Sequence, residues 1–353
     1  MTKQNIYCEP QLFIGDTENF DFNKVNVSFS GNNALNSMSV TINNPDMDNF
    51  KLFNKPISFY LNYGSNDGVP IFRGFIKNVN TGVGSVTIKA LDPRCFITGK
   101  EGIPINITET NNYDGFTVVQ FLQAYIEDYV NINDTIISVR ALKDIENPPL
   151  MKAVRGNITD VYGTIKSQIE KKINDTDLID IKRHYIDMID DGLYSNIIVY
   201  TEKDIDNSFP SLILKYKDGL LDYKYKKRAP TSSITVSGKG ETMQGPVVGS
   251  FTYGNTPLGR VGKTLSGEFK SNAEAQQAGV IDILQNYDAL DKFNISCDKG
   301  HYTGLGSIVQ LQVDENELSK DFRLISKKID YGNKGVTLSL GVAKINIKIS
   351  DYI

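Results

Sequence analysis

The chain has 353 residues, of which 40% are hydrophobic, and it contains 17 phenylalanines and 18 tyrosines but no tryptophan. A chain of this length exceeds one typical hydrophobic core and predicts two or three domains. The formal net charge of -4 lacks the basic surplus expected of a general nucleic-acid-binding protein.

Three cysteines, Cys8, Cys95 and Cys297, lie far apart and in no paired spacing, so they are expected to be reduced thiols. The N-terminal residues lack the apolar core of a signal peptide, and no stretch approaches the roughly 18 apolar residues of a membrane span. We therefore expect a chain that is made and folded in the cytosol, with no membrane insertion.

The first hundred residues alternate apolar and polar side chains in short runs, which is typical of strands with one buried face. Residues 25–29 and 38–42 predict a hairpin with a generous loop. Residues 57–91 predict a three-stranded meander that follows directly. Five strands with short links predict a small closed or nearly closed β-barrel.

The pattern changes at about residue 105. Residues 116–130 place apolar side chains at helical spacing after Asp114 as the N-cap, and residues 158–173 predict a second helix. Short strands are expected at 136–139 and 197–200. These elements predict a mixed α/β unit inserted between β-rich parts.

The strand pattern returns at residue 212. Residues 212–216 and 221–225 flank an Asp218-Gly219 turn and predict a β-hairpin. A further strand is expected at 233–237. The Gly- and Pro-rich residues 238–267 are interpreted as an extended loop or linker.

A capped helix precedes the last strands. Ser271 and Glu274 have the spacing of a capping box, which predicts a helix over about 272–287. Strands are then expected at 293–297, in a closing meander over 308–341, and at 345–349.

The closing meander repeats the first one in weakened form. Each copy starts with an alternating run and continues through a Phe-Arg pair, which is Phe72-Arg73 in the first copy and Phe322-Arg323 in the second. A Gly-containing turn then leads to a Val-Thr pair, at 86–87 and at 336–337. One hypothesis is two barrels in one chain, and the alternative is that any two antiparallel meanders look alike at this level.

Two glycine-rich motifs are candidates for nucleotide sites. Gly262-Lys263-Thr264 would need a glycine five positions earlier and a helix straight afterwards, but position 257 is proline and Ser266-Gly267 interrupts a helix. The glycines at 238, 240 and 245 are not followed by a helix N-terminus that could receive a dinucleotide phosphate. No cofactor-binding residue is predicted.

The candidate catalytic and metal-binding residues are equally sparse. Acidic residues crowd between 175 and 191 around His184, but their spacing does not match a calcium loop, so a solvated loop or helix face is expected. The only other histidine, His301, lies in an expected turn. No nucleophile elbow or zinc motif occurs, and nothing marks two of the 42 acidic residues as a glycosidase pair. We predict no catalytic, cofactor-binding or metal site residues and no enzyme activity.

The order of these elements resembles that of a known family. The passages that carry the resemblance are "SMSVTINNPDMDNFKLFNKPISFYLNYG" with the following "IFRGFIKNV", and "SNAEAQQAGVIDILQNYDALDKFNISCDKGHYTGLGSIVQLQV". They resemble the baseplate hub proteins of contractile phage tails and of R-type phage-tail-like bacteriocins. This family includes the late-control protein D group and the N-terminal part of type VI secretion spike proteins. The segment from about 105 to 205 matches least.

The resemblance implies a mainly β fold with an α/β insert and two tube-like small β-barrel domains related by an internal repeat. It implies a first barrel domain at 1–105, an inserted α/β domain at 106–205 and a second β-rich domain with a barrel at 206–353. Hub proteins of this family form homotrimers, so three chains would present six similar barrels to a sixfold tail tube and threefold symmetry to a central spike.

The implied partners are a second and third copy of the chain, the tail tube protein, the central spike protein and other baseplate proteins such as wedge or tape-measure proteins. No cofactor and no specific nucleic-acid binding are implied. The expected location is the bacterial cytoplasm during assembly and then the baseplate of a virion or tail-like particle.

Two other functions stay open. A receptor- or glycan-binding tail-tip protein would use an aromatic platform, for which Tyr216, Tyr223 and Tyr225 are candidates, although alternating tyrosines are more often cross-strand packing pairs. A cell-wall hydrolase would need two inward carboxylates in one cleft.

Overall fold

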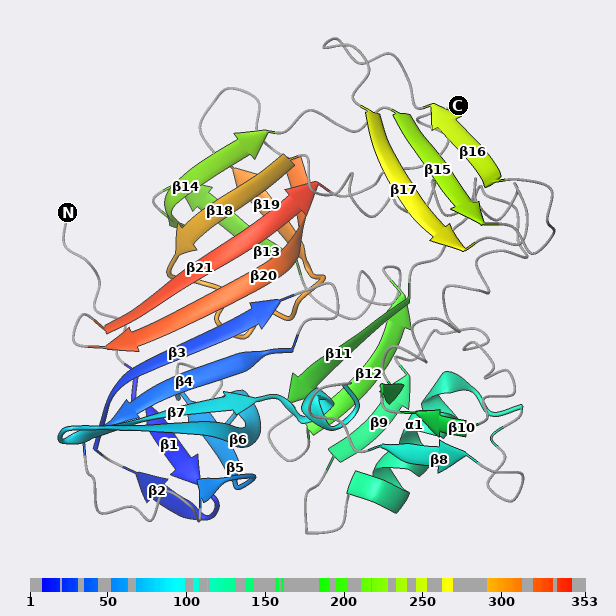
Figure 1. Ribbon diagram of the computed structural model, residues 1–353. Coiled ribbons are helices and arrows are strands. Elements are labelled where there is room, and N and C mark those ends of the chain that lie inside the picture. Colours follow the sequence, from blue (N-terminus) through cyan, green and yellow to red (C-terminus); the bar gives the residue numbers. More distant parts are fainter. Residues whose placement is uncertain are drawn as a thin grey trace.

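A computed structural model gives the structure of the chain. It describes residues 8–19, 21–30, 35–43, 52–62, 68–98, 104–107, 113, 115–130, 137–141, 156–158, 160–161, 184–190, 195–201, 211–216, 218–227, 233–239, 246–252, 262–268, 291–312, 320–332 and 335–344. Figure 1 shows two strand-rich bodies joined edge to edge, with smaller units beside them.

The first barrel is built from the N-terminal strands, and the predicted hairpin and meander are confirmed. Its strands are β1 (Gln11–Ile14), β2 (Thr17–Asn19), β3 (Phe22–Ser30), β4 (Ser37–Ile42), β5 (Pro56–Tyr60), β6 (Pro70–Gly82) and β7 (Ser85–Leu91). They pair antiparallel in the order β3-β4-β7-β6-β5-β1-β2. Burial alternates along β4, where Met38, Val40 and Ile42 point into the core. The period-two sequence pattern therefore sets which face is buried.

A buried ion pair lies where the chain leaves this barrel. The 3₁₀ helix η3 (Pro93–Phe96) follows β7, and Asp92 caps it by accepting from the Arg94 backbone N–H. The Arg94 guanidinium donates back to the same carboxylate, with Nη2 2.6 Å from Oδ2, and both side chains are buried. The Asn36 N–H also donates to Asp92 Oδ2, at 2.6 Å. The pair thus fixes the end of β7 to the start of β4.

The second barrel is built from strands late in the chain, and it closes on itself. Its strands are β13 (Leu212–Tyr216), β14 (Gly219–Lys227), β18 (Asp291–Cys297), β19 (Ile308–Gln312), β20 (Lys320–Gly332) and β21 (Gly335–Lys344). They follow the order β19-β13-β14-β18-β21-β20, and β20 pairs again with β19 to complete the ring. The predicted closing meander, β19-β20-β21, is confirmed.

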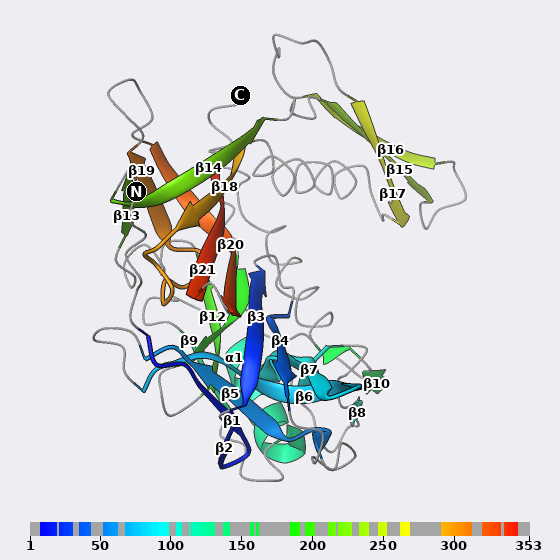
Figure 2. The same ribbon diagram turned by 90° about the vertical axis from the view of Figure 1, so that its left-hand side faces the viewer.

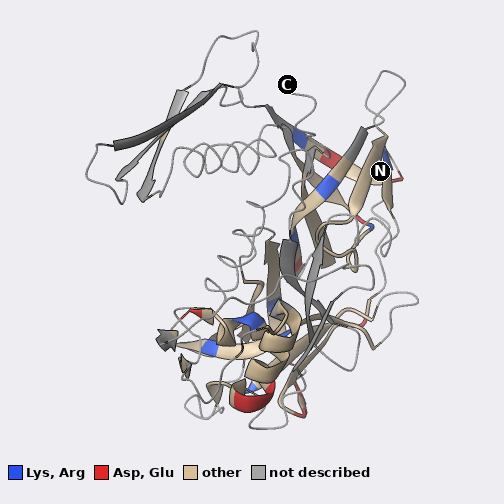
Figure 3. Cartoon of the chain, turned by 90° about the vertical axis from the view of Figure 1, so that its right-hand side faces the viewer, with Lys and Arg blue, Asp and Glu red and all other residues tan. Residues whose placement is uncertain are grey.

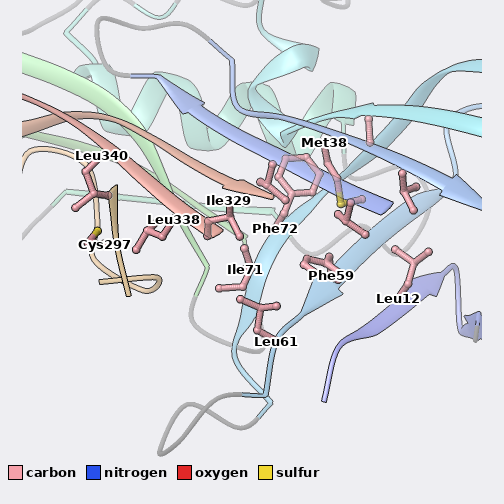
Figure 4. Packing of buried hydrophobic residues seen from close by; sticks show 14 of the residues in the cluster. Leu12, Met38, Phe59, Leu61, Ile71, Phe72, Cys297, Ile329, Leu338 and Leu340 are labelled. Atoms are coloured by element: carbon pink, nitrogen blue, oxygen red, sulfur yellow. The ribbon is translucent and has the colours of Figure 1, made fainter. Parts of the chain in front are cut away.

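One hydrophobic cluster runs through both barrels. It contains Leu12, Met38 and Phe59 from the first barrel together with Ile329 and Leu340 from the second. Figure 4 shows these side chains and their neighbours gathered on facing strands. The two barrels therefore share a continuous apolar core where they meet.

The segment between the barrels is a mixed α/β unit, as predicted. It contains β8 (Ile105–Ile107), α1 (Val118–Tyr125), the π-helical turn η4 (Ile126–Val130), β9 (Ile137–Ala141), β10 (Gly156–Ile158), β11 (His184–Asp190) and β12 (Ser195–Thr201). β8 pairs with β10, and β9, β12 and β11 form a separate sheet in which β12 and β9 run parallel. The Tyr125 hydroxyl donates to the Phe96 carbonyl at 2.9 Å and attaches α1 to the first barrel.

Three expectations about this unit need correction. The N-cap of the first helix is Thr117 and not Asp114, because Thr117 and Gln120 form a complete capping box. The second helix does not begin at Ile158, which ends strand β10, but Val161 directly after Asp160 is helical, and 162–173 lie outside the described residues. Residues 184–190, interpreted as part of a solvated loop or helix face, form strand β11, because a complete antiparallel partner is available in β12.

Two expectations about the second β-rich part are also wrong. Residues 238–267 are not only a linker, because β15 (Ser233–Lys239), β16 (Pro246–Thr252) and β17 (Gly262–Glu268) form a three-stranded sheet. This sheet lies apart from both barrels in Figures 1 and 2. β13 and β14 do not form a β-hairpin; they share only a two-residue parallel pairing. The expected helix at about 272–287 and the strand at 345–349 lie outside the described residues.

Candidate assembly interface

The two meanders have the same strand register, displaced by 250 positions. Phe72 of β6 lies opposite Phe59 of β5, and Phe322 of β20 lies opposite Val309 of β19. Further equivalent pairs are Ser58–Arg73 with Ile308–Arg323, Val79–Ile88 with Ile329–Leu338, and Gly82–Ser85 with Gly332–Gly335. The register differs only near the bulge of the long strand, which lies between Ile76 and Asn78 in β6 and between Leu324 and Ser326 in β20. A register shared on both sides of the bulge is far more specific than two generic meanders, so the predicted internal repeat is confirmed.

The correspondence covers every main strand of the barrels. In chain order and in space, β1, β3, β4, β5, β6 and β7 match β13, β14, β18, β19, β20 and β21. Both long strands carry a register shift next to their middle, between Ile76 and Asn78 in β6 and between Leu324 and Ser326 in β20. The one change of direction is at the first strand, because β1 runs antiparallel to β5 whereas β13 runs parallel to β19.

The barrels are joined by antiparallel pairing of β3 with the second half of β20. The register runs from Val25 opposite Tyr331 to Ser30 opposite Ser326. Val25, Val27 and Ile329 on this junction are completely buried. Beside them, Asn26 Nδ2 donates to Asp330 Oδ1 across the two strands. The junction combines backbone hydrogen bonds, apolar burial and one polar pair, which are the ordinary components of a strand interface.

A buried lysine of the second barrel, Lys327, contacts the first barrel at this junction. Lys327 Nζ donates to the carbonyls of His301 at 2.7 Å and Thr303 at 2.9 Å, and it lies 4.4 Å from the centroid of the Phe29 ring of β3. Burial, with the neighbouring Lys327 charge, lowers the pKa of His301 to about 4. At neutral pH the His301 imidazole is therefore uncharged, and of these two side chains Lys327 alone carries a charge.

In the row of strands that joins the two barrels, β6 and β14 each have a long edge that no described strand covers; the three-residue strand β2, which pairs with β1, is a further edge strand. β6 pairs with β5 only up to Phe75, so its last residues have β7 on one side alone. β14 pairs with β18 along nearly its whole length, but with β13 only at Gly219 and Leu220. Figure 1 shows the strands stacked from β14 at one end, through β18, β21, β20, β3, β4 and β7, to β6 at the other. Open edges are sites of further strand pairing unless something covers them.

The residues considered for chemistry do not gather into a site. Gly262, Lys263 and Thr264 begin strand β17 rather than a phosphate-binding loop. His184 begins β11, far along the chain from the buried turn that holds His301. Within the described ranges, no three His, Cys, Asp or Glu residues stand close enough to hold a metal ion.

The tyrosines considered as a glycan platform lie on the second barrel. Tyr216 of β13 and Tyr223 of β14 are exposed, whereas the side chain of Tyr225 is outside the described part. Because the expected hairpin does not form, Tyr216 and Tyr223 are not cross-strand partners within it.

Neither the charged residues nor the Cys297 thiol indicates a functional site in the described part of the chain. Figure 3 shows acidic and basic residues scattered over the described elements without a large patch of one sign. Burial and the nearby Asp298 raise the pKa of the Cys297 thiol to about 12, so this cysteine is an inert core residue. None of the described helices is long and apolar enough to span a bilayer.

Sequence comparison identifies no relatives, because no protein-family profile and no curated protein matches the chain. Solved structures do match. A tail protein from Neisseria meningitidis MC58 superimposes with a TM-score of 0.66 at 14% identity, covering 98% of each chain. The 43 kDa tail protein of prophage MuSo2 from Shewanella oneidensis gives a TM-score of 0.65 at 11% identity, covering 95% of this chain and 98% of that one.

A third match comes from a secretion machine. It is the E. coli c3393 protein, a component of the type VI secretion system that is structurally similar to the T4 bacteriophage tail proteins gp27 and gp5. It superimposes with a TM-score of 0.59 at 9% identity, covering 95% of this chain and 77% of that one. The chain thus has the fold of these tail and secretion proteins, including both barrels and the segments between them.

Proposed function

From a fold shared over nearly the whole chain with phage tail proteins, we propose that the protein is a baseplate hub. In this role it joins a sixfold tail tube to a threefold central spike in a contractile tail or tail-like injection particle. The observation that carries the proposal is the internal repeat, in which two barrels with one strand register are joined edge to edge.

The repeat supports a trimer because a trimer of such chains can match both a sixfold tube and a threefold spike. Three copies of a chain with two similar barrels present six similar barrels, which suit a sixfold tube. The three chains are identical to one another, so the assembly as a whole has the threefold symmetry of the spike. Each chain supplies one barrel-to-barrel contact, the junction between β3 and β20, so three chains supply three of the six contacts in such a ring. The contacts between chains would then complete the ring.

The same proposal assigns the remaining parts. The domains divide at about residues 105 and 205, and the α/β unit and the β15–β17 sheet face other baseplate proteins, such as wedge or tape-measure proteins. In this proposal the protein has a structural role and is not an enzyme, so any wall-degrading activity would belong to a separate protein. It acts first in the bacterial cytoplasm, during assembly, and then in the baseplate.

The hub proposal is tested by measuring the oligomeric mass of the chain and its binding to the tube and spike proteins. The purified chain is measured by sedimentation over a wide concentration range, alone and with the tube and spike proteins of the same particle. We expect a trimer that binds both partners at different faces. A chain that stays monomeric and binds neither partner would refute the hub, and glycan binding through Tyr216 and Tyr223 in its place would favour the tail-tip alternative.

A further inference from the structure

We propose that the open edge of β6 in one copy of the chain pairs antiparallel with β14 of a second copy, in the register that β20 and β3 use within the chain. The proposal rests on the trimer of the proposed function and names the strands and residues that would hold it together. The partner is a second copy because the chain already contains both halves of this contact in equivalent positions.

The register between the copies follows from the repeat. β4 and β18 are equivalent, since Val40 lies opposite Ile88 of β7 and Cys297 lies opposite Leu338 of β21. The strands next to them can therefore be matched residue by residue. The matched positions are Val25 with Leu220, Asn26 with Asp222, and Val27 with Tyr223, with Leu221 as the extra residue of a bulge in β14.

The junction inside the chain then predicts the pairs between chains. Val27 lies opposite Ile329, whose equivalent in β6 is Val79, so Tyr223 of one copy is placed opposite Val79 of the next. By the same transfer, the pair of Asn26 and Asp330 becomes Asp222 opposite Asn80. The register further places Lys224 opposite Asn78, as Ser28 lies opposite Lys328 within the chain.

Exposure of the single chain fits this assignment. Tyr223 is 37% exposed, although it is a large side chain on a strand with a free edge, and its counterpart at the internal junction, Val27, is completely buried. Val79 is half-buried, whereas its equivalent Ile329 is completely buried. Leu220, like its counterpart Val25, is buried already in the single chain. The central pair of the internal junction, Val27 and Ile329, therefore has counterparts that are left partly uncovered at the two open edges.

The polar residues at the two contacts also show that the β6 and β14 edges are complementary. At the internal junction the amide is on β3 and the carboxylate on β20, with Asn26 donating to Asp330. At the proposed contact the two groups are exchanged, with the carboxylate of Asp222 on β14 and the amide of Asn80 on β6. Asp222 Oδ1 accepts from the Tyr223 N–H at 2.8 Å, and its second oxygen can accept from Asn80. An exchanged pair preserves the hydrogen bond, whereas two carboxylates at these positions would repel.

The contact is head to tail, because it joins different surfaces of two identical chains. Such contacts form closed rings when the rotation between copies closes. With two similar barrels per chain, a barrel-to-barrel rotation of one sixth of a turn would close the ring after three chains and would leave neither the β6 edge nor the β14 edge exposed.

A charge exchange tests the proposal. N80D places two carboxylates opposite each other and should raise the concentration of half-maximal trimer assembly at least about tenfold, since the change occurs at every contact between chains. N80D/D222N restores an Asn–Asp pair in the orientation found at the internal junction, and should return assembly to near the wild-type value. N78D is the matched control, because the register places position 78 opposite Lys224, where a new carboxylate should not weaken assembly.

Assembly is measured by sedimentation, and urea unfolding confirms that each variant folds, since these positions are exposed in the single chain. If the wild type forms trimers but N80D assembles equally well, or N80D/D222N is no better than N80D, the strand assignment is wrong and the hub trimer stands. If the wild type never forms trimers, the proposed function falls together with this inference.

Discussion

Truncation of Ile329 to alanine should destabilise the chain strongly, whereas truncation of its repeat equivalent Val79 should not. Ile329 is completely buried on β20, opposite Val27 of β3 and Leu338 of β21. Removing three carbons costs about 2.4 kcal/mol in lost burial, at about 0.8 kcal/mol per carbon. The cavity left behind increases the total loss of unfolding free energy to about 3–4 kcal/mol.

Val79 serves as the matched control within the same chain. It occupies the same register position on β6, but it is only half-buried, because no described strand lies where β3 covers Ile329. Removal of its two outer carbons should therefore cost only about 0.8 kcal/mol in the monomeric chain. In the assembled ring its cost should rise, because Tyr223 of the next copy would cover it.

Urea unfolding, followed by far-ultraviolet circular dichroism at a concentration where the chain is monomeric, measures both variants. Equal shifts of the midpoint for Ile329→Ala and Val79→Ala would refute the reasoning, since it attributes the difference to the β3–β20 junction alone. A loss below about 1 kcal/mol for Ile329→Ala would show that the junction does not hold in solution.

Three further predictions concern individual side chains. Asp92→Ala leaves Arg94 buried without its partner and should lower the unfolding free energy by about 3–5 kcal/mol in urea titrations, whereas replacement of both residues by apolar ones should recover most of the loss. His301 has a pKa of about 4, below its ordinary value of 6.5, so the unfolded chain binds more protons between these values. Stability should therefore fall by up to about 3 kcal/mol as the pH drops from 6.5 to 4, and urea midpoints of H301Q should show a flatter profile. A Cβ at Gly74 would lie 2.3 Å from a backbone carbonyl oxygen, so Gly74→Ala should cost at least about 2 kcal/mol in thermal unfolding, whereas Gly332→Ala, with its nearest contact at 3.8 Å, should be mild.

Alternation of apolar and polar residues predicted both meanders because one face of each strand is buried. In β4, for example, every second residue from Met38 to Ile42 lies in the core. The same periodicity fixes the register, since a shift by one residue would turn the buried face outward. This explains why the repeat could be recognised from the sequence despite few identical residues.

The errors arose where a local signal competed with a distant partner. Gly219 does adopt a positive φ of 94°, as an Asp-Gly turn requires, yet β13 and β14 pair chiefly with β19 and β18. Strand β16 contains Pro246 and Gly249, and strand β17 contains Gly262 and Gly267, which is why the segment resembled a linker. Local composition does not reveal which distant strand will offer its edge.

The candidate interface was the part least accessible to sequence analysis. Nothing near Val27 or Ile329 indicates that these residues, about 300 positions apart, lie opposite each other. Asn26 and Asp330 are ordinary surface residue types, and only the strand pairing makes them partners. The repeat was visible in the sequence, but the edge that joins its two copies was not.

The most direct test of the hub proposal is a three-dimensional image of the assembled tail particle in which this chain is located by a terminal tag. The account predicts one ring of three copies on the tail axis, with six similar barrels under the sixfold tube, threefold symmetry towards the spike, and β14 of each copy beside β6 of the next. Six copies in one ring, or density for this chain away from the tail axis, would contradict it.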